Sequence, residues 1–214
     1  MTYTPFEMDP TPSEARRSRQ RQEARRSILE ATDALLLEDG YEAFSMRRLA
    51  ERCGYTAPTI YHYFRDKPGL IDALLEERFS GLLDRIRSVA PSKDPADTMR
   101  SLARAFVDFG MRNPTFYRLL TTPRPESGEP PRAAEEARAV LEEPILELER
   151  DGRLYTRDAE TTKQTVWVLL HGLIHLRLSR PEHPWSSDLV EVALESMFRG
   201  IVRPAPTAAS RQAS

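Results

Sequence analysis

The sequence predicts an all-α fold in which an N-terminal three-helix unit precedes a larger helical body. Apolar residues recur at spacings of three and four along almost every periodic segment, and no segment alternates convincingly as a half-buried strand does. Two short segments near residue 50 carry helix caps and are separated by a glycine, which is typical of a helix-turn-helix. A length of 214 residues suffices for a small domain attached to a larger one.

The first helix is expected from about Arg16 to Asp39. Ala24, Ile28 and Leu35 fall on one apolar stripe of this segment, and Gly40 follows where a left-handed cap would stop the helix. The second helix should begin after Ser45, whose hydroxyl can accept a hydrogen bond from an unpaired backbone N–H, and end at Gly54. Thr56 caps the third helix, and Pro58 is tolerated in its first turn.

The third helix, in the stretch TAPTIYHYFRDK, has an apolar side and a polar side. At 100° per residue, Ala57, Ile60 and Phe64 cluster on the side to be buried. The outward face carries Pro58, Thr59 and His62, and its flanks carry Tyr61 and Tyr63. Small and polar groups on such a face suit base edges in a DNA major groove, while flanking phenols suit the phosphates. Lys67, at the start of the next helix, adds a cation and a positive helix end for a further phosphate.

Arginines are concentrated ahead of this unit. The run RRSRQRQEARR between Arg16 and Arg26 holds six arginines and one acid, although the net charge of the chain is only −2. A run of this kind by itself is equally compatible with a solvated helix face. Next to a predicted helix-turn-helix, it favours attraction to the phosphates of nucleic acid.

The stretch SMRRLAERCGYTAPTIYHYFRDKPGLIDALL resembles the DNA-binding core of the tetracycline-repressor (TetR) family of bacterial regulators. The resemblance covers about residues 19 to 75 and is carried by Tyr61, Tyr63, Phe64 and Lys67 after a Gly-Tyr-Thr turn. It implies an all-helical homodimer, in which a DNA-binding head joins a body that binds a small effector. Arg48 departs from the family, which often places an acid there, so no capping box can form with Ser45.

These observations predict a domain organisation and a DNA-binding site. The expected parts are a disordered tail over 1–15, a head over 16–67, a ligand-binding and dimerisation body over 68–203, and a disordered tail over 204–214. The predicted DNA-binding residues are Arg19, Ser45, Arg47, Thr56, Pro58, Thr59, Tyr61, His62, Tyr63 and Lys67.

The body is expected to hold an apolar pocket walled by Phe106 and Phe109 on one helix and by Trp167 and His171 on another. Aromatic side chains with one polar imidazole suit a hydrophobic effector, although the same residues could simply be core. The helix TVWVLLHGLIHLRL resembles a body helix of many TetR-family members. Its mid-helix Gly172 indicates either a close helix approach, as at a dimer seam, or a tolerated packing defect.

Other functions find less support in the sequence. His171 and His175 could form a metal pair, but no third ligand is evident, so we expect no metal. Cys53 lies on an apolar stripe and is interpreted as a buried residue rather than a redox sensor. No phosphate loop, nucleophile elbow or apolar carboxylate pair points to an enzyme or to a cofactor. With no membrane span or secretory signal evident, we expect a cytoplasmic protein.

We therefore predict a homodimeric transcriptional regulator that is released from a palindromic double-stranded DNA operator by a small hydrophobic effector. The alternatives are a metal- or redox-responsive regulator of the same fold, and a helical interaction module that binds no DNA.

Overall fold

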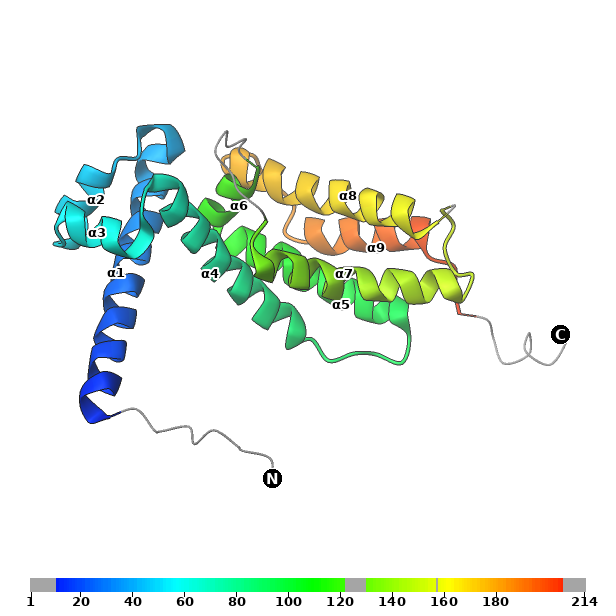
Figure 1. Cartoon of the computed structure of the whole chain (residues 1–214). Helices are drawn as coiled ribbons and strands as arrows, with labels where there is room; N and C mark the ends of the chain where they lie inside the picture. Colours follow the sequence, from blue (N-terminus) through cyan, green and yellow to red (C-terminus); the bar gives the residue numbers. More distant parts are fainter. Residues whose placement is uncertain (1–10, 122–129, 157, 206–214) are drawn as a thin grey trace, which may run out of the picture. The chain divides into compact units, whose positions relative to one another are not determined.

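The structure is a computed structural model that describes residues 11–121, 130–156 and 158–205 (Figure 1). Over these residues the only β-type pairing is an isolated bridge between Leu154 and Val202. The helices are α1 (Pro12–Ala43), α2 (Met46–Cys53), α3 (Ala57–Phe64), α4 (Lys67–Arg87), α5 (Pro95–Arg112), α6 (Pro114–Thr121), α7 (Arg132–Arg150), α8 (Ala159–Ser179) and α9 (Leu189–Ile201). The predicted all-α class is confirmed.

The chain forms two compact units, and the division between them falls between Leu74 and Leu75. This point lies inside α4, so a single helix contributes its first turns to one unit and its remainder to the other. The boundary that the sequence suggested, after Lys67, is the point at which α4 begins. A helix start is visible in a sequence, whereas a division inside a helix depends on which neighbours each turn contacts.

Helix α1 begins earlier than the sequence indicated. The Thr11 hydroxyl accepts a hydrogen bond from the Glu14 N–H, and the Glu14 carboxylate accepts one from the Thr11 N–H, which completes a capping box. Thr11 to Ala15 therefore belong to a helix start and not to the tail predicted over 1–15, of which residues 1–10 lie outside the described residues. At the other end, the helical backbone is interrupted at Gly40, where φ is 77°.

The caps predicted for the two short helices are confirmed. The hydroxyl of Ser45 accepts from the Arg48 N–H, and that of Thr56 accepts from the Thr59 N–H. Gly54 ends α2 in the left-handed conformation, with φ of 71°. These caps orient α2 and α3 at a tight turn, which is the helix-turn-helix arrangement.

Helices α1 and α2 are joined by ion pairs as well as by apolar packing. The guanidinium of Arg52 donates to both carboxylate oxygens of Glu38 at 2.7 and 3.0 Å, and Arg48 lies 2.5 Å from Asp39. These hydrogen bonds lower the pKa of the exposed Glu38 carboxyl. Arg48, which cannot take part in a capping box, thus contacts α1 instead.

In the second unit, α5 lies at the centre and packs against α6, α7, α8 and α9. Helices α8 and α9 run side by side (Figure 1). Gly110 of α5 allows α8 to approach closely, because a Cβ at this position would lie 2.9 Å from the Cδ1 atom of the fully buried Ile174. The core of this unit therefore depends on a small residue at the crossing of α5 and α8.

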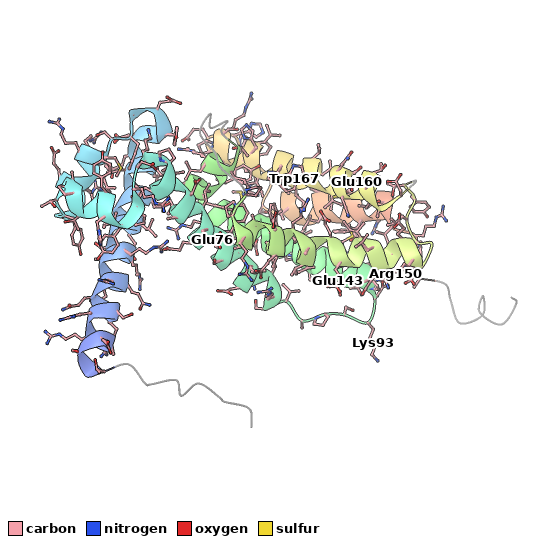
Figure 2. All side chains as sticks on the ribbon, viewed as in Figure 1. Glu76, Lys93, Glu143, Arg150, Glu160 and Trp167 are labelled. Carbon is pink, nitrogen blue, oxygen red and sulfur yellow. The ribbon has the colours of Figure 1, made fainter. Side chains whose placement is uncertain are left out.

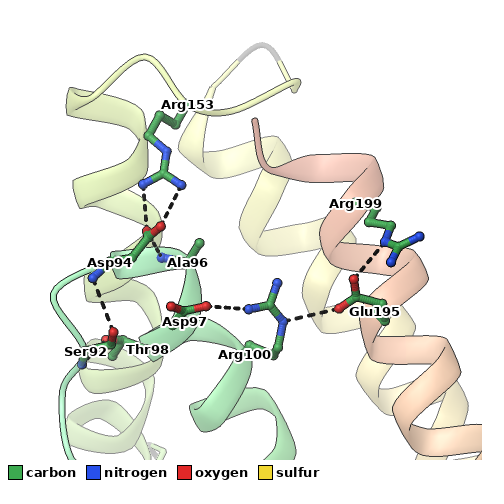
Figure 3. Close-up of polar contacts among 9 residues, drawn as sticks. All are labelled: Ser92, Asp94, Ala96, Asp97, Thr98, Arg100, Arg153, Glu195 and Arg199. Carbon is green, nitrogen blue, oxygen red and sulfur yellow. Dashed lines mark hydrogen bonds and ion pairs between the residues drawn. The ribbon is translucent and has the colours of Figure 1, made fainter. Parts of the chain in front are cut away.

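Asp94, at the start of α5, and Arg153, just after α7, form an ion pair (Figure 3). The carboxylate of Asp94 accepts two hydrogen bonds from the Arg153 guanidinium, at 2.7 and 3.1 Å, and one from the Ala96 N–H. The Arg153 hydrogen bonds lower the pKa of Asp94. Arg153 also donates to the carbonyl of Arg203 at 3.2 Å, next to the bridge between Leu154 and Val202. These contacts join the end of α7 to the segment after α9.

The remaining expectations for the body concern helix ends and connections. The sequence also predicts Asp158 as the N-cap of α8, and its carboxylate accepts from the Thr161 N–H at 2.7 Å. Helix α7 begins after Pro131 and continues through the buried Pro144. The sequence also predicts a proline-rich loop over 123–131. Most of that segment, and most of the tail predicted over 204–214, lie outside the described residues.

Candidate functional site

The outward face of α3 presents the side chains that the sequence predicted. Ile60 and Phe64 are buried beneath it, whereas Pro58, His62 and Tyr61 are exposed. The Tyr61 residue is 46% exposed, so its phenol is accessible from solvent. The sidedness of the helix therefore agrees with a surface able to enter a groove.

Two predicted contacts on α3 have additional partners inside the unit. The hydroxyl of Thr59 lies 2.8 Å from the hydroxyl of Thr56, the cap of the same helix, and Thr59 is half-buried. Tyr63 is also half-buried, and its ring meets the His62 ring edge-on at a centroid distance of 5.8 Å. Thr59 still offers a methyl group and an acceptor, which is enough for a thymine methyl or an amino group on a base edge.

Lys67 is placed differently from the prediction. Its ammonium donates to the backbone carbonyls of Tyr41 at 2.9 Å and Phe44 at 3.2 Å, and it lies 4.3 Å from the centroid of the Tyr41 ring. These carbonyls follow the break in α1 at Gly40, where helical partners are missing. The side chain thus stabilises the end of α1 and does not extend outward as a phosphate contact would require.

Two predicted arginines are highly accessible. The Arg47 side chain is 87% exposed, and its guanidinium lies 3.8 Å from Glu51 one turn further along α2. Arg19 is exposed on α1, where its Nε donates to the carbonyl of Ala15. Ion pairs this exposed are weak, so Arg47 can exchange its carboxylate for a phosphate at little cost.

Sequence reasoning missed Arg65, which ends α3. Its φ of 65° and ψ of −61° place a non-glycine residue in a rarely populated conformation. The Arg65 N–H donates to the Tyr61 carbonyl at 2.8 Å, and the residue is exposed. No local signal marks this position, because arginine is not a residue that favours positive φ.

The second unit encloses a cavity of about 930 Å³, lined by residues of α4, α5, α6, α7 and α8. Its wall is mostly apolar and includes Phe106, Trp167 and His171, three of the four residues predicted for a pocket. Figure 2 labels Trp167 on α8. A volume of this size falls in the range of sites that take small molecules.

Phe109, the fourth predicted residue, does not line the cavity. Its ring meets Phe116 edge-on at a centroid distance of 5.7 Å and lies 3.6 Å from where a Cβ on Gly81 would be. Phe109 follows Phe106 by three residues, so its side chain is rotated by about 60° around α5. That rotation directs it toward α4 and α6 and removes it from the wall.

His171 is surrounded by aromatic rings. The Trp167 ring lies at a centroid distance of 3.9 Å, and the rings of Phe106 and Tyr117 each lie at 5.4 Å. The Tyr117 hydroxyl donates to the backbone carbonyl of His171 at 2.8 Å and lies 3.0 Å from the imidazole Nδ1. The other ring nitrogen, Nε2, is buried and has no hydrogen-bond partner among the described residues.

Burial governs the protonation of this pair. It lowers the pKa of His171 from 6.5 to about 4 and raises the pKa of Tyr117 from 10.0 to about 12. At neutral pH the imidazole and the phenol are therefore both uncharged. Tyr117 was not selected from the sequence, because its partner is 54 residues away along the chain.

The cavity wall also carries charged groups. Lys163 of α8 forms an ion pair with Glu142 of α7 at 2.9 Å, and both line the cavity. Glu135 and Arg138 of α7 contribute further to the wall. The cavity thus combines a large apolar surface with a few polar groups from two helices.

The residues predicted as metal or redox candidates lie in different surroundings. The described residues include no group of three or more His, Cys, Asp or Glu that could hold a metal ion. His175 is exposed, whereas His171 lies in the cavity wall, so the two predicted metal candidates differ in surroundings. Cys53 is half-buried, with its Sγ 4.0 Å from the Ala50 carbonyl.

One face of α8 is apolar and exposed. Val168 is 64% exposed and Leu176 is 47% exposed, and Gly172 lies between them at spacings of four residues. No heavy atom outside its own helix lies within 4 Å of the Cβ position of Gly172, so no helix of the described chain approaches closely there. The described residues make no such approach at Gly172, and the dimer seam suggested by the sequence stays a prediction.

Across the described ranges, no helix has the length and apolar character required to cross a membrane.

Family profiles match both units of the chain. The family described as "Bacterial regulatory proteins, tetR family" matches residues 28–74, and "Tetracyclin repressor-like, C-terminal domain" matches residues 99–201. The first match contains the helix-turn-helix, and the second runs from Met99 within α5 to the end of α9. The chain belongs to the TetR family of transcriptional regulators.

Curated relatives include both a repressor and an activator. The HTH-type transcriptional repressor KstR of Rhodococcus jostii is 32% identical over 104 residues, which are 49% of this chain and 49% of that protein. The HTH-type transcriptional activator FasR of Mycolicibacterium smegmatis is 30% identical over 101 residues, which are 47% of this chain and 46% of that protein. The chain spans about half the length of these curated relatives.

Solved structures share the fold over most of the chain. A TetR family transcription regulator from Marinobacter aquaeolei has a TM-score of 0.69 at 21% identity, covering 87% of this chain and 100% of that one. A tetR family protein from Shewanella sp. PV-4 has a TM-score of 0.68 at 18% identity, covering 85% and 99%. At these identities the likeness shows the fold.

Proposed function

We propose that this protein is a dimeric regulator that binds a palindromic DNA operator through α2 and α3 and is released by a small apolar effector. The observation that carries the proposal is the two-sidedness of α3, which buries Ile60 and Phe64 and presents polar and phenolic groups outward. Any surface helix has a polar face, but this one carries small and phenolic groups directly after the turn of a helix-turn-helix. Membership of the TetR family supports the same function.

Within this proposal the exposed residues divide into two roles. Thr59 and its neighbours Pro58 and His62 meet base edges, where hydrogen bonds and methyl contacts distinguish sequences. Tyr61 and Tyr63 hold the phosphates on either side of the groove. Further contacts to the backbone come from the helix caps and the exposed arginines: Ser45, Thr56, Arg47 and Arg19.

The exposed face of α8 supports assembly with a second copy of the chain. Val168, Gly172 and Leu176 form a line on which the glycine leaves room for another helix to approach. Val192 of the neighbouring α9 is also exposed, at 54%. Burying such a surface against its own copy creates a two-fold interface, and a two-fold dimer requires inverted half-sites in the DNA.

The cavity in the second unit supports control by an effector. An effector must bind one conformation of the dimer better than another, and by linkage it then weakens DNA binding by the same factor as DNA weakens effector binding. Such coupling is typically about 1–3 kcal/mol. The resident groups Phe106, Trp167 and His171 would contact the effector directly.

Repression is the direction we propose, and activation is the second candidate because FasR, a relative of similar identity, is an activator. Control by metal or redox chemistry has weaker support, since the described residues include no metal-binding group. The position of Lys67 also modifies the proposal, because its ammonium is bonded within the head.

Selection of bound duplexes from a random DNA pool tests the proposal most directly. The expected result is an inverted repeat bound by two copies of the chain, with binding that weakens steeply as salt increases. Recovery of a single asymmetric site, bound by one copy, would contradict the dimeric assignment. Absence of any enriched duplex would favour the alternative in which the helical unit contacts only protein.

A further inference from the structure

The hydrogen bonds around His171 determine which of its nitrogens carries the proton. Tyr117 has one hydroxyl proton, and its oxygen lies within bonding distance of two groups, the His171 carbonyl at 2.8 Å and Nδ1 at 3.0 Å. A carbonyl oxygen can only accept, so the hydroxyl proton must be given to the carbonyl. The Tyr117 oxygen can then only accept from Nδ1, which must carry the imidazole proton.

Fixing the proton on Nδ1 leaves Nε2 as a bare acceptor. The ring is neutral because burial depresses the pKa of His171 to about 4. Nε2 has no partner among the described residues and almost no accessible surface, so a donor reaches it only when the side chains around it move aside. The Trp167 ring, tilted against the imidazole at a centroid distance of 3.9 Å, and the Tyr117 hydrogen bonds keep the ring in this orientation.

We infer that the ligand of the cavity has an apolar frame carrying a neutral hydrogen-bond donor, a hydroxyl or an N–H, that binds to Nε2 of His171. The inference rests on the proposed effector role of the cavity and specifies the chemistry of that effector. An ether or ketone has no proton to give to Nε2, and a carboxylate brings only lone pairs and a negative charge to it. Tyr117 is thereby a specificity-determining residue, although it acts through His171.

A carboxylate ligand would need a cation elsewhere on the wall. Lys163 lines the cavity but already pairs with Glu142 at 2.9 Å. Arg138 lines the cavity from α7, beside Glu135. A negatively charged ligand would therefore lie near acidic as well as basic side chains of α7 and α8. A neutral hydroxyl compound can bind without breaking the ion pair between Lys163 and Glu142.

The first measurement is the tautomer of His171 in the full-length protein, by ¹⁵N NMR of the imidazole. The chain has four histidines, so His171→Gln identifies the signal by its loss, and the exposed His175→Gln is the matched control that retains it. We expect a protonated Nδ1 and an unprotonated Nε2 at neutral pH. A proton on Nε2 would overturn the inference. This measurement needs neither a ligand nor a variant of Tyr117.

The second measurement compares the binding affinities of matched probes by calorimetry. One set is decanol, its methyl ether and decanoate. The other set is the alcohol, methyl ether and carboxylate on a phenylbutyl frame. On any frame that binds, the alcohol should bind about tenfold more tightly than the ether or the carboxylate, equivalent to one satisfied acceptor. Tyr117→Phe removes the constraint on the tautomer and should reduce this preference to within about twofold.

The outcomes separate the two proposals. Binding of the probes with no preference for the alcohol overturns the ligand chemistry and leaves the effector role intact. Failure of every probe to bind counts against the cavity as an effector site, and it overturns both proposals. Alcohol-selective binding that also releases operator DNA supports both.

Discussion

The two units use polar groups in opposite ways. In the first unit the candidate contacts are on the surface, where Tyr61 and Arg47 are exposed to solvent. In the second unit the candidate contact is inside, where His171 is held by Tyr117 and covered by Trp167. A DNA-binding surface must meet a rigid, hydrated partner, whereas a cavity must replace the water around its ligand.

This difference affects how each unit responds to substitution. Exposed contacts can be removed with little loss of stability, so their loss should appear mainly in affinity. A buried polar pair contributes to both folding and binding, so removing one member affects both. Lys67 is the exception in the first unit, because its half-buried ammonium is bonded to backbone carbonyls despite its position beside the candidate DNA surface.

The largest effect is expected for Lys67→Met. Loss of the ammonium leaves the carbonyls of Tyr41 and Phe44 without their donor, so the free energy of unfolding should fall by about 1–3 kcal/mol. The salt dependence of DNA binding should stay unchanged. Arg47→Met is the matched control, with a stability change below about 0.5 kcal/mol and a salt slope lowered by about 1. Urea unfolding and binding at several salt concentrations measure both, and a reversed pattern would restore Lys67 as a phosphate contact.

A smaller effect is expected for Tyr61→Phe. The substitution removes one exposed hydroxyl, which should weaken binding to all duplexes alike by about 0.5–1.5 kcal/mol without changing stability. Binding to the selected operator and to a scrambled duplex provides the comparison. Tyr155→Phe, at an exposed tyrosine of the second unit, should leave both affinities unchanged. A loss confined to the operator would assign Tyr61 to base reading.

The last effect appears only in acid and involves His171. In the unfolded chain the imidazole takes up a proton near pH 6.5, whereas in the folded protein it does so only near pH 4. Between these values the unfolded state binds more protons, so stability falls as the pH falls through this window. Water around the partly accessible ring reduces the effect. The urea midpoint of His171→Gln should fall less between pH 7 and pH 5 than that of wild type or His175→Gln, and equal slopes would contradict the shift.

Local chemistry made much of the first unit predictable. Ser45, Gly54 and Thr56 act within a few residues of where they stand, so their roles as caps could be read from spacing alone. Lys67 could not be assigned in the same way, because its two acceptors precede it by 26 and 23 residues.

In the second unit, spacing identified an aromatic stripe on α5 but not which ring faces the cavity. Phe106 lines the wall and Phe109 contacts Phe116, and that choice depends on how α4 and α6 cross α5. Tyr117 was missed for a related reason, since its meaning comes entirely from the His171 backbone and ring. Spacing patterns therefore do not predict contacts between residues that are far apart in the sequence.

The pairing of Leu154 with Val202 has a practical consequence for the design of fusion proteins. The Tyr155 N–H donates to the Ile201 carbonyl and the Arg203 N–H donates to the Arg153 carbonyl, at 2.9 and 2.7 Å. These two hydrogen bonds hold the end of α9 and the residues just after it against the segment that follows α7. A purification tag or fluorescent partner attached after Ser214 lies beyond these hydrogen bonds and should leave α9 undisturbed. Trimming the chain back to Gly200 would remove both hydrogen bonds and leave the buried Arg153 without its contact to the Arg203 carbonyl.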